Sequence, residues 1–211
     1  MRQSIRDFVR IASECCDLKE PIYEFGSFQV VSQERISDMR DFFPNKNYIG
    51  CDIELGQGVD RIIDIQKMDL PSEIAGTVLC LDTFEHVINV HLAIAEIYRV
   101  MTHDAILLLS SHTNFPRHYK NDYWRFTPEC FRMLLSKFDH SIVSHAGIED
   151  NPHALVAIAK KSGMIEHDEK FQEQMIAWAK RWKHPKRNLK KIIKNFIPPV
   201  LWTPTMRERS F

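Results

Sequence analysis

Two apolar segments on either side of an amphipathic helix constrain the fold of this chain most strongly. Residues 77–83 read TVLCLDT and residues 105–111 read AILLLSS, and both are nearly continuous in apolar residues. Such runs are typical of strands that are buried on both faces of a parallel sheet. Between them, residues 90–101 carry apolar side chains at helical spacing, as a crossover helix does. We therefore expect a parallel sheet with helices packed on its faces.

The other segments continue this alternation over the first 160 residues. Their periodicity predicts helices at 4–16, 32–43 and 127–138, and strands at 21–25, 47–53, 61–65, 140–148 and 153–161. The prediction is an α/β fold with a doubly wound, mostly parallel sheet of seven strands. Because the last two strands follow each other closely, we expect them to form a terminal antiparallel hairpin at the sheet edge.

The first two predicted strands each end in residues suited to binding a ligand. The first strand runs into Glu24, Gly26 and Ser27, and the second ends in Asp52, about 25 residues further on. A glycine turn lets the backbone approach a ligand closely, and an acid at the tip of the next strand can accept hydrogen bonds from ribose hydroxyls. This pattern is typical of open α/β domains that hold an adenosine-containing molecule.

Over roughly residues 20–160 the chain resembles the class I S-adenosylmethionine-dependent methyltransferases, of the small type 11 kind. The resemblance depends on YEFGS at the first strand, GCDIELGQGVD at the second, LCLDTFEHV at the fourth, and IYRVM before AILLLSS. It implies a Rossmann-like methyltransferase fold, S-adenosyl-L-methionine as the cofactor and methyl transfer as the activity. The segment NDYWRFTPECF also resembles one found in family members associated with surface-polysaccharide pathways.

The resemblance implies a set of residues that contact the cofactor: Glu24, Gly26, Ser27, Asp52, Ile53, Asp64, Ile65, Asp82 and Thr83. In the family pattern, Asp52 accepts from the ribose, whereas Asp64 and Ile65 hold the adenine. Asp82 and Thr83 face the sulfonium and the substrate. An alternative for Asp52 and Asp64 is that each carboxylate only caps the helix that follows its strand.

The turn after the first predicted strand contains fewer glycines than the family motif does. The motif has the form E-x-G-x-G-x-G, and here Gly26 alone supplies the close backbone approach. Two interpretations stay open from the sequence. The chain is either an active methyltransferase or a catalytically inactive relative that kept the fold as a binding or scaffolding protein.

Three histidines are candidates for catalysis because each follows a predicted strand on the ligand side of the sheet. They are His86, His112 and His118. If the methyl acceptor is a hydroxyl, a base must take its proton, and a neutral histidine suits that role. Each histidine could instead satisfy backbone groups, and Glu85 is interpreted as an acid at a helix start. No histidine or cysteine spacing matches a metal site, so no metal is expected.

The loop after the fifth strand, SSHTNFPRHYKNDYWRF, is the most chemically diverse in the chain. Ligands of open α/β sheets bind at this end of the strands. We expect Arg117, Tyr123 and Trp124 to contact the substrate, with Trp124 stacking on a sugar and Arg117 meeting a phosphate. The acceptor is thus expected to be a hydroxyl of a sugar, a glycan precursor or another small molecule. Alternatively, the aromatic side chains form a lid that packs over the core.

Composition limits the remaining possibilities. Residues 1–159 carry 15 Lys and Arg against 23 Asp and Glu, whereas residues 160–211 carry 13 against 5. An acidic body does not favour a nucleic-acid partner. The five cysteines, an odd number without CxxC pairs, favour reduced thiols and a cytoplasmic location. The N-terminus does not read as a secretory signal.

The basic C-terminal part is expected to be a separate helical extension. We predict a methyltransferase domain at 1–163, including an N-terminal helix within 1–18, and an extension at 164–211. Residues 168–182 predict one amphipathic helix and residues 189–197 another, with lysines opposite an apolar stripe. Such a helix could attach the protein to the inner face of an anionic membrane, pack on the domain itself, or join two copies in a homodimer.

Overall fold

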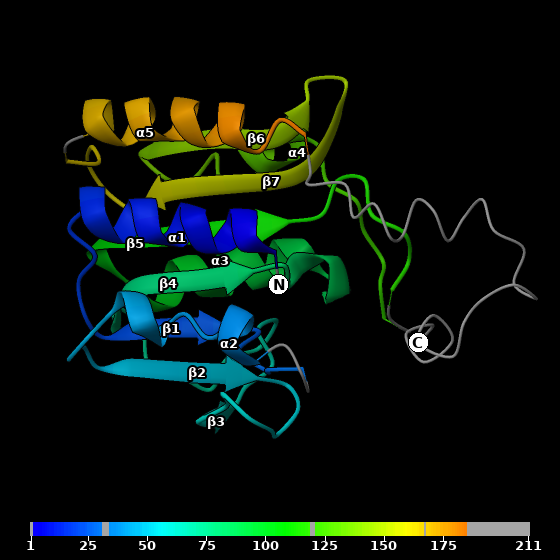
Figure 1. The fold of residues 1–211 in the computed structure, drawn as a ribbon. Helices are drawn as coiled ribbons and strands as arrows, with labels where there is room; N and C mark the ends of the chain where they lie inside the picture. Colours follow the sequence, from blue (N-terminus) through cyan, green and yellow to red (C-terminus); the bar gives the residue numbers. More distant parts are fainter. Residues whose placement is uncertain (1, 31–33, 119–120, 167, 185–211) are drawn as a thin grey trace, which may run out of the picture.

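The computed structural model describes residues 2–30, 34–118, 121–166 and 168–184. Its centre is a seven-stranded sheet in the order β3-β2-β1-β4-β5-β7-β6 (Figure 1). The strands are β1 Ile22–Phe25, β2 Tyr48–Asp52, β3 Arg61–Ile62, β4 Ala75–Leu81, β5 Met101–Ser111, β6 His140–Ile148 and β7 Asn151–Lys160. The pairs formed by the first five strands are parallel, and β7 is antiparallel to both of its neighbours. The predicted doubly wound α/β fold is confirmed.

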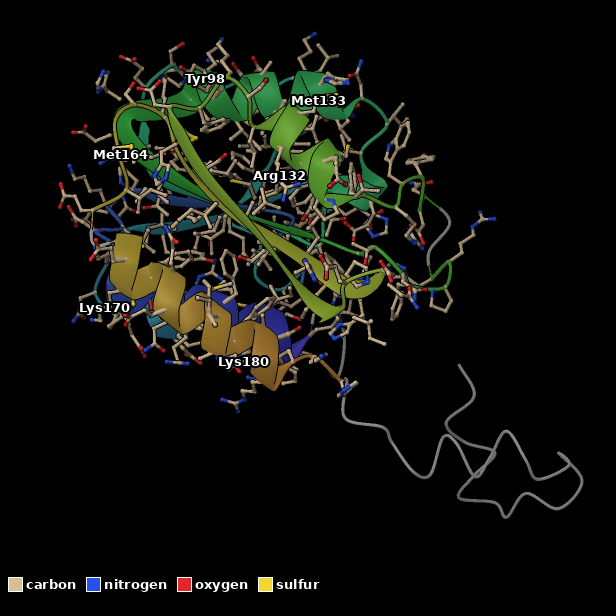
Figure 2. The ribbon with its side chains drawn as sticks, turned by 90° about the horizontal axis from the view of Figure 1, so that it is seen from above. Tyr98, Arg132, Met133, Met164, Lys170 and Lys180 are labelled. Atoms are coloured by element: carbon tan, nitrogen blue, oxygen red, sulfur yellow. The ribbon has the colours of Figure 1, made fainter. Side chains whose placement is uncertain are left out.

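Helices cover both faces of this sheet. They are α1 Gln3–Cys15, α2 Glu34–Ser37, η1 Arg40–Phe42, η2 Phe84–His86, α3 Val90–Val100, α4 Pro128–Leu134 and α5 Asp168–Arg181. One core packs α3 and α4 on one face, and a second packs α1 and α5 on the other. Figure 2 shows this layering, with Tyr98 and Arg132 marking α3 and α4, and Lys170 and Lys180 marking α5. The layers leave the carboxyl ends of the parallel strands together at one edge.

The predicted helix at 32–43 is not continuous. The described part of this segment holds α2 and the short η1, separated by two residues. The Asp38 carboxylate accepts a hydrogen bond from the backbone N–H of Arg40 at 2.9 Å. A short acidic side chain that bonds to nearby backbone groups competes with helical hydrogen bonds. Apolar periodicity alone therefore overestimated the length of this helix.

Helix α5 packs against the N-terminal helix. The rings of Phe8 and Phe171 are 6.5 Å apart in an edge-to-face arrangement. The indole N–H of Trp178 donates to the backbone oxygen of Ser4 at 2.8 Å, and Trp178 itself is buried. Residues 168–181 thus complete the same core as α1. The predicted basic helix at 189–197 lies outside the described residues. Among the described residues, none of the helices combines the length and apolar character that crossing a bilayer requires.

Candidate functional site

The turn after β1 lies directly against the tip of β4. Gly26 has φ of +88°, and a Cβ placed on it would lie 2.0 Å from Oγ1 of Thr83. The backbone N–H of Gly26 donates to the oxygen of Cys51, which ties the turn to the end of β2. A residue with a side chain could not occupy this position without displacing its neighbours. The glycine identified in the sequence is therefore required by both its conformation and its packing.

The loop that follows Gly26 packs on the loop that follows β2. The backbone N–H of Gln29 donates to the oxygen of Gln57 at 2.9 Å. Asp52 accepts from the backbone N–H groups of Phe28 and Glu54, both at 3.1 Å. The Asp52 carboxylate thus joins these two loops and does not cap a helix. It lies at the tip of β2 and is only partly buried, so it also remains exposed to a ligand.

Glu24, at the end of β1, is buried and hydrogen bonded. The hydroxyl of Tyr48 donates to its carboxylate at 2.8 Å. Burial raises the pKa of Glu24 to about 7, although the hydrogen bond from Tyr48 and the nearby charge of Arg40 act in the opposite direction. This buried carboxyl lies in β1 two residues before Gly26.

A Glu24→Gln variant is expected to gain stability over the wild type as the pH rises from 5 to 8. The folded carboxyl keeps its proton up to a pKa of about 7, above its ordinary value of 4.5. The folded state therefore binds more protons between these values, and wild-type stability falls as the pH rises. Glutamine has no such proton and can still accept from Tyr48. The difference in free energy of unfolding, measured with urea, should grow by about 1–3 kcal/mol. Parallel pH profiles would contradict this assignment.

Asp64 and Ile65, which the resemblance assigns to adenine, follow β3. Asp64 accepts from the backbone N–H of Gln66 at 2.8 Å, so its carboxylate stabilises a turn. Ile65 is buried in the core under α3. Ile53, by contrast, is 66% exposed beside Asp52. These residues lie at the expected strand ends, and their contacts with a cofactor stay a prediction.

Asp82 forms an ion pair that the sequence did not suggest. Its carboxylate is 2.9 Å from the guanidinium of Arg2, and the hydroxyl of Ser110 donates to it at 2.9 Å. Burial would raise the pKa of Asp82, but Arg2 and His112 outweigh burial and lower it. Arg2 precedes α1 and reaches the strand tips because α1 lies across the adjacent face of the sheet. No local signal in the sequence connects these two residues.

The three predicted histidines lie together next to these strand tips. The ring centroid of His118 is 5.2 Å from that of His86 and 5.1 Å from that of His112. They come from different segments: His86 ends η2, His112 follows β5, and His118 lies in the loop after it. Adjacent parallel strands bring the first two together, and the loop folds back to add the third. The predicted candidates thus form one cluster.

Glu85 belongs to this cluster and does not simply begin a helix. It is fully buried, and the hydroxyl of Ser111 donates to its Oε2 at 2.7 Å. Its Oε1 lies 3.3 Å from Nε2 of His112. Burial, reinforced by the nearby charge of Asp82, raises the pKa of Glu85 to about 8. Burial also lowers the pKa of His112 to about 4. Glu85 does lie in the first turn of η2, as expected, but its carboxylate is buried and contacts Ser111 and His112.

Asp122 and Arg125 are further members of the site that sequence reasoning missed. The Asp122 carboxylate lies 3.1 Å from Nδ1 of His118 and accepts from Nη2 of Arg125 at 2.7 Å. The hydrogen bond from Arg125 lowers the pKa of Asp122 well below its ordinary value. The spacing of four residues from His118 to Asp122 was the available signal. Both residues belong to the chemically diverse loop that follows β5.

The predicted substrate-binding residues lie around this cluster. The indole N–H of Trp124 donates to the backbone oxygen of Val87 at 2.8 Å, and the N–H of Tyr123 donates to that of Glu85. These bonds attach the loop to η2 and to the residue after it. Trp124 is nevertheless 43% exposed and Arg117 is exposed, so both can meet a ligand. Whether they contact the substrate stays a prediction.

Comparison with known proteins agrees with this fold. Residues 31–109 match the model of a methyltransferase domain family. The structure of a SAM-dependent methyltransferase from Archaeoglobus fulgidus is similar, with a TM-score of 0.58 and 14% identity over 76% of this chain and 95% of that one. One from Aquifex aeolicus has a TM-score of 0.53 and 12% identity, covering 76% and 93%. No match was found among curated proteins.

The structure of CurJ carbon methyltransferase is also similar, with a TM-score of 0.52 and 13% identity over 67% of this chain. The chain spans about half of that protein, 48% of its length. Together, the family match and the structural neighbours confirm the class I S-adenosylmethionine-dependent methyltransferase fold.

Proposed function

We propose that this protein transfers a methyl group from S-adenosylmethionine to a hydroxyl of a sugar, a glycan precursor or another small molecule. The methyltransferase fold and the family match support the general reaction. The observation that carries the hydroxyl acceptor is the histidine cluster beside the strand tips. A hydroxyl must lose its proton to attack a methyl group, and a histidine is the side chain best suited to accept it.

The residues at the tips of β1 and β2 fit the cofactor. The turn at Gly26 brings main chain to the surface of the site, and the partly exposed carboxylate of Asp52 can accept from ribose hydroxyls. The hydroxyl oxygen of Ser27 is buried without a hydrogen-bond partner in the described part of the chain. Burying a polar atom without a partner is unfavourable, and a ligand that formed a hydrogen bond with Ser27 would remove this penalty. When bound, the cofactor supplies an electrophilic methyl group on sulfur.

His86 is proposed as the residue that takes the proton from the acceptor. Its Nδ1 lies 2.9 Å from the backbone oxygen of Asn121. A carbonyl oxygen only accepts, so Nδ1 carries the hydrogen and the lone pair is on Nε2. Two residues earlier, Phe84 begins η2 directly after Thr83, beside the glycine turn. His86 therefore lies between the glycine turn, where the cofactor is expected, and the loop at 121–126. The remaining requirement is alignment of the acceptor with the methyl group.

The test combines binding and turnover on the full chain. Calorimetry with S-adenosylmethionine and S-adenosylhomocysteine should show one site per chain. Transfer of a labelled methyl group should then be measured to free sugars, sugar phosphates and nucleotide sugars, with amines as the comparison. We expect transfer to a hydroxyl acceptor. If neither form of the cofactor bound, the proposal would fail; binding without any transfer would favour an inactive binding protein instead.

A further inference from the structure

Three side chains near the tips of β4 and β5 are arranged like the ligands of a metal ion. Glu85, His112 and His118 can each present one ligand atom, and these atoms lie within 4.8 Å of one another. A carboxylate and two imidazoles are the ligand types that zinc and similar transition metals prefer. The sequence did not reveal the group, because its members are 27 and 6 residues apart along the chain.

Two of these side chains are buried with polar atoms that lack partners. Oε1 of Glu85 and Nδ1 of His112 have no hydrogen-bond partner among the described residues. Both residues are at least nine-tenths buried, at 0% and 6% exposed. Buried polar atoms are normally paired, since leaving them unpaired is costly. An ion bound to Oε1 of Glu85 and Nε2 of His112 would remove that cost for the carboxylate, whereas Nδ1 of His112 is not a ligand atom.

Neighbouring residues orient the group from outside. The hydroxyl of Ser111 donates a hydrogen bond to Oε2 of Glu85, and the other carboxylate oxygen, Oε1, lies toward His112. The carboxylate of Asp122 lies 3.1 Å from Nδ1 of His118, so the lone pair of that ring is on Nε2. Metal-binding histidines characteristically donate their other nitrogen to a carboxylate in this way. Arg125 in turn holds Asp122 in place.

The spacing of the atoms suits a tetrahedral ion. Ligand atoms about 2.0–2.2 Å from such an ion lie about 3.4 Å from one another. Oε1 of Glu85 and Nε2 of His112 are already 3.3 Å apart. His118 lies in an exposed loop, and its ligand atom needs to approach by at most about 1.4 Å, within the range of side-chain adjustment.

We propose that Glu85, His112 and His118 bind a divalent transition-metal ion, with zinc as the probe. Three protein ligands leave a coordination position open, as in catalytic sites. The binding site itself requires no assumption about methyl transfer. A role in binding the acceptor oxygen at the open position would rest on the proposed function. His86, whose ring lies next to that of His118, is not one of the ligands.

The experiment uses the untagged full-length chain after dialysis against EDTA. Titration with Zn²⁺ by calorimetry should show one ion per chain and a rise in melting temperature, and Co²⁺ should give the visible absorption of a low-symmetry site. His118→Ala, in an exposed loop, is expected to fold normally and to weaken Zn²⁺ binding by about 10–100-fold or more. His103→Ala removes a histidine that is 79% exposed at the other end of β5, and should bind as the wild type does.

Glu85→Gln provides a second variant, since glutamine can still accept from Ser111, and it too should weaken Zn²⁺ binding. Absence of saturable binding at one ion per chain would overturn the proposal. Equal Zn²⁺ affinity in the wild type and His118→Ala would do the same. Calorimetry with S-adenosylhomocysteine, run on the same metal-free samples, separates the two proposals. A sample that binds S-adenosylhomocysteine but not zinc contradicts only the metal site, and a sample that binds zinc but not S-adenosylhomocysteine contradicts only the proposed function.

Discussion

Replacing His86 with asparagine should lower the turnover number by about 10²–10⁴-fold, the usual contribution of a positioned general base. Asparagine was chosen because its amide N–H₂ can replace Nδ1 and keep the hydrogen bond to the oxygen of Asn121. The side chain would then retain its position and lose only the nitrogen that accepts the proton. The KM for S-adenosylmethionine should stay within about twofold, because a lost transition-state interaction lowers kcat without changing cofactor binding.

His103→Asn is the matched control for this variant. It removes an imidazole that is 79% exposed at the start of β5, away from the strand tips, and should leave kcat unchanged. Turnover is measured by transfer of a labelled methyl group to the acceptor that the panel identifies. A loss smaller than about tenfold in His86→Asn would remove His86 from its proposed role. A loss in kcat accompanied by a large rise in KM would indicate a role in binding instead.

Gly26→Ala should destabilise the protein by about 2–5 kcal/mol and weaken the binding of S-adenosylhomocysteine. Two costs add. The left-handed backbone at φ +88° costs about 1–2 kcal/mol for a residue with a Cβ. The new methyl group would also lie 2.0 Å from Oγ1 of Thr83, and overpacking of this kind costs about 1–3 kcal/mol. Because Thr83 follows the tip of β4, relief of the contact must displace the turn or the strand end.

The chain contains a control that separates the two costs. Gly163 has φ of +75°, and nothing lies within 4 Å of a Cβ placed there. Gly163→Ala should therefore show only the backbone cost, measured as the free energy of unfolding in urea. In the Gly26→Ala background, Thr83→Ala removes both atoms that approach closest and should recover part of the loss. Equal destabilisation at positions 26 and 163 would show that contact with Thr83 has no role.

Local sequence patterns predicted the elements well where the periodicity was strong. The apolar runs that became β4 and β5, and the helix between them, lie within a few residues of their expected bounds. The prediction was wrong for 32–43, where Asp38 bonds to the backbone of Arg40 and interrupts the helix. Competition between a side chain and helical hydrogen bonds depends on geometry that periodicity does not report. The residues at 168–182 were correctly expected to be helical, but their contact with α1 was not.

Local sequence patterns were enough to predict the alternation of strands and helices, the need for glycine at position 26, and the individual histidines worth considering. These features depend on side-chain period and on backbone conformation, which neighbours along the chain largely set. Only the tertiary structure brought Glu85 and His112 to 3.3 Å and joined Arg2 to Asp82. Such contacts arise because parallel strands end at one edge of a sheet and helices pack across its faces. They link residues that sequence order leaves far apart.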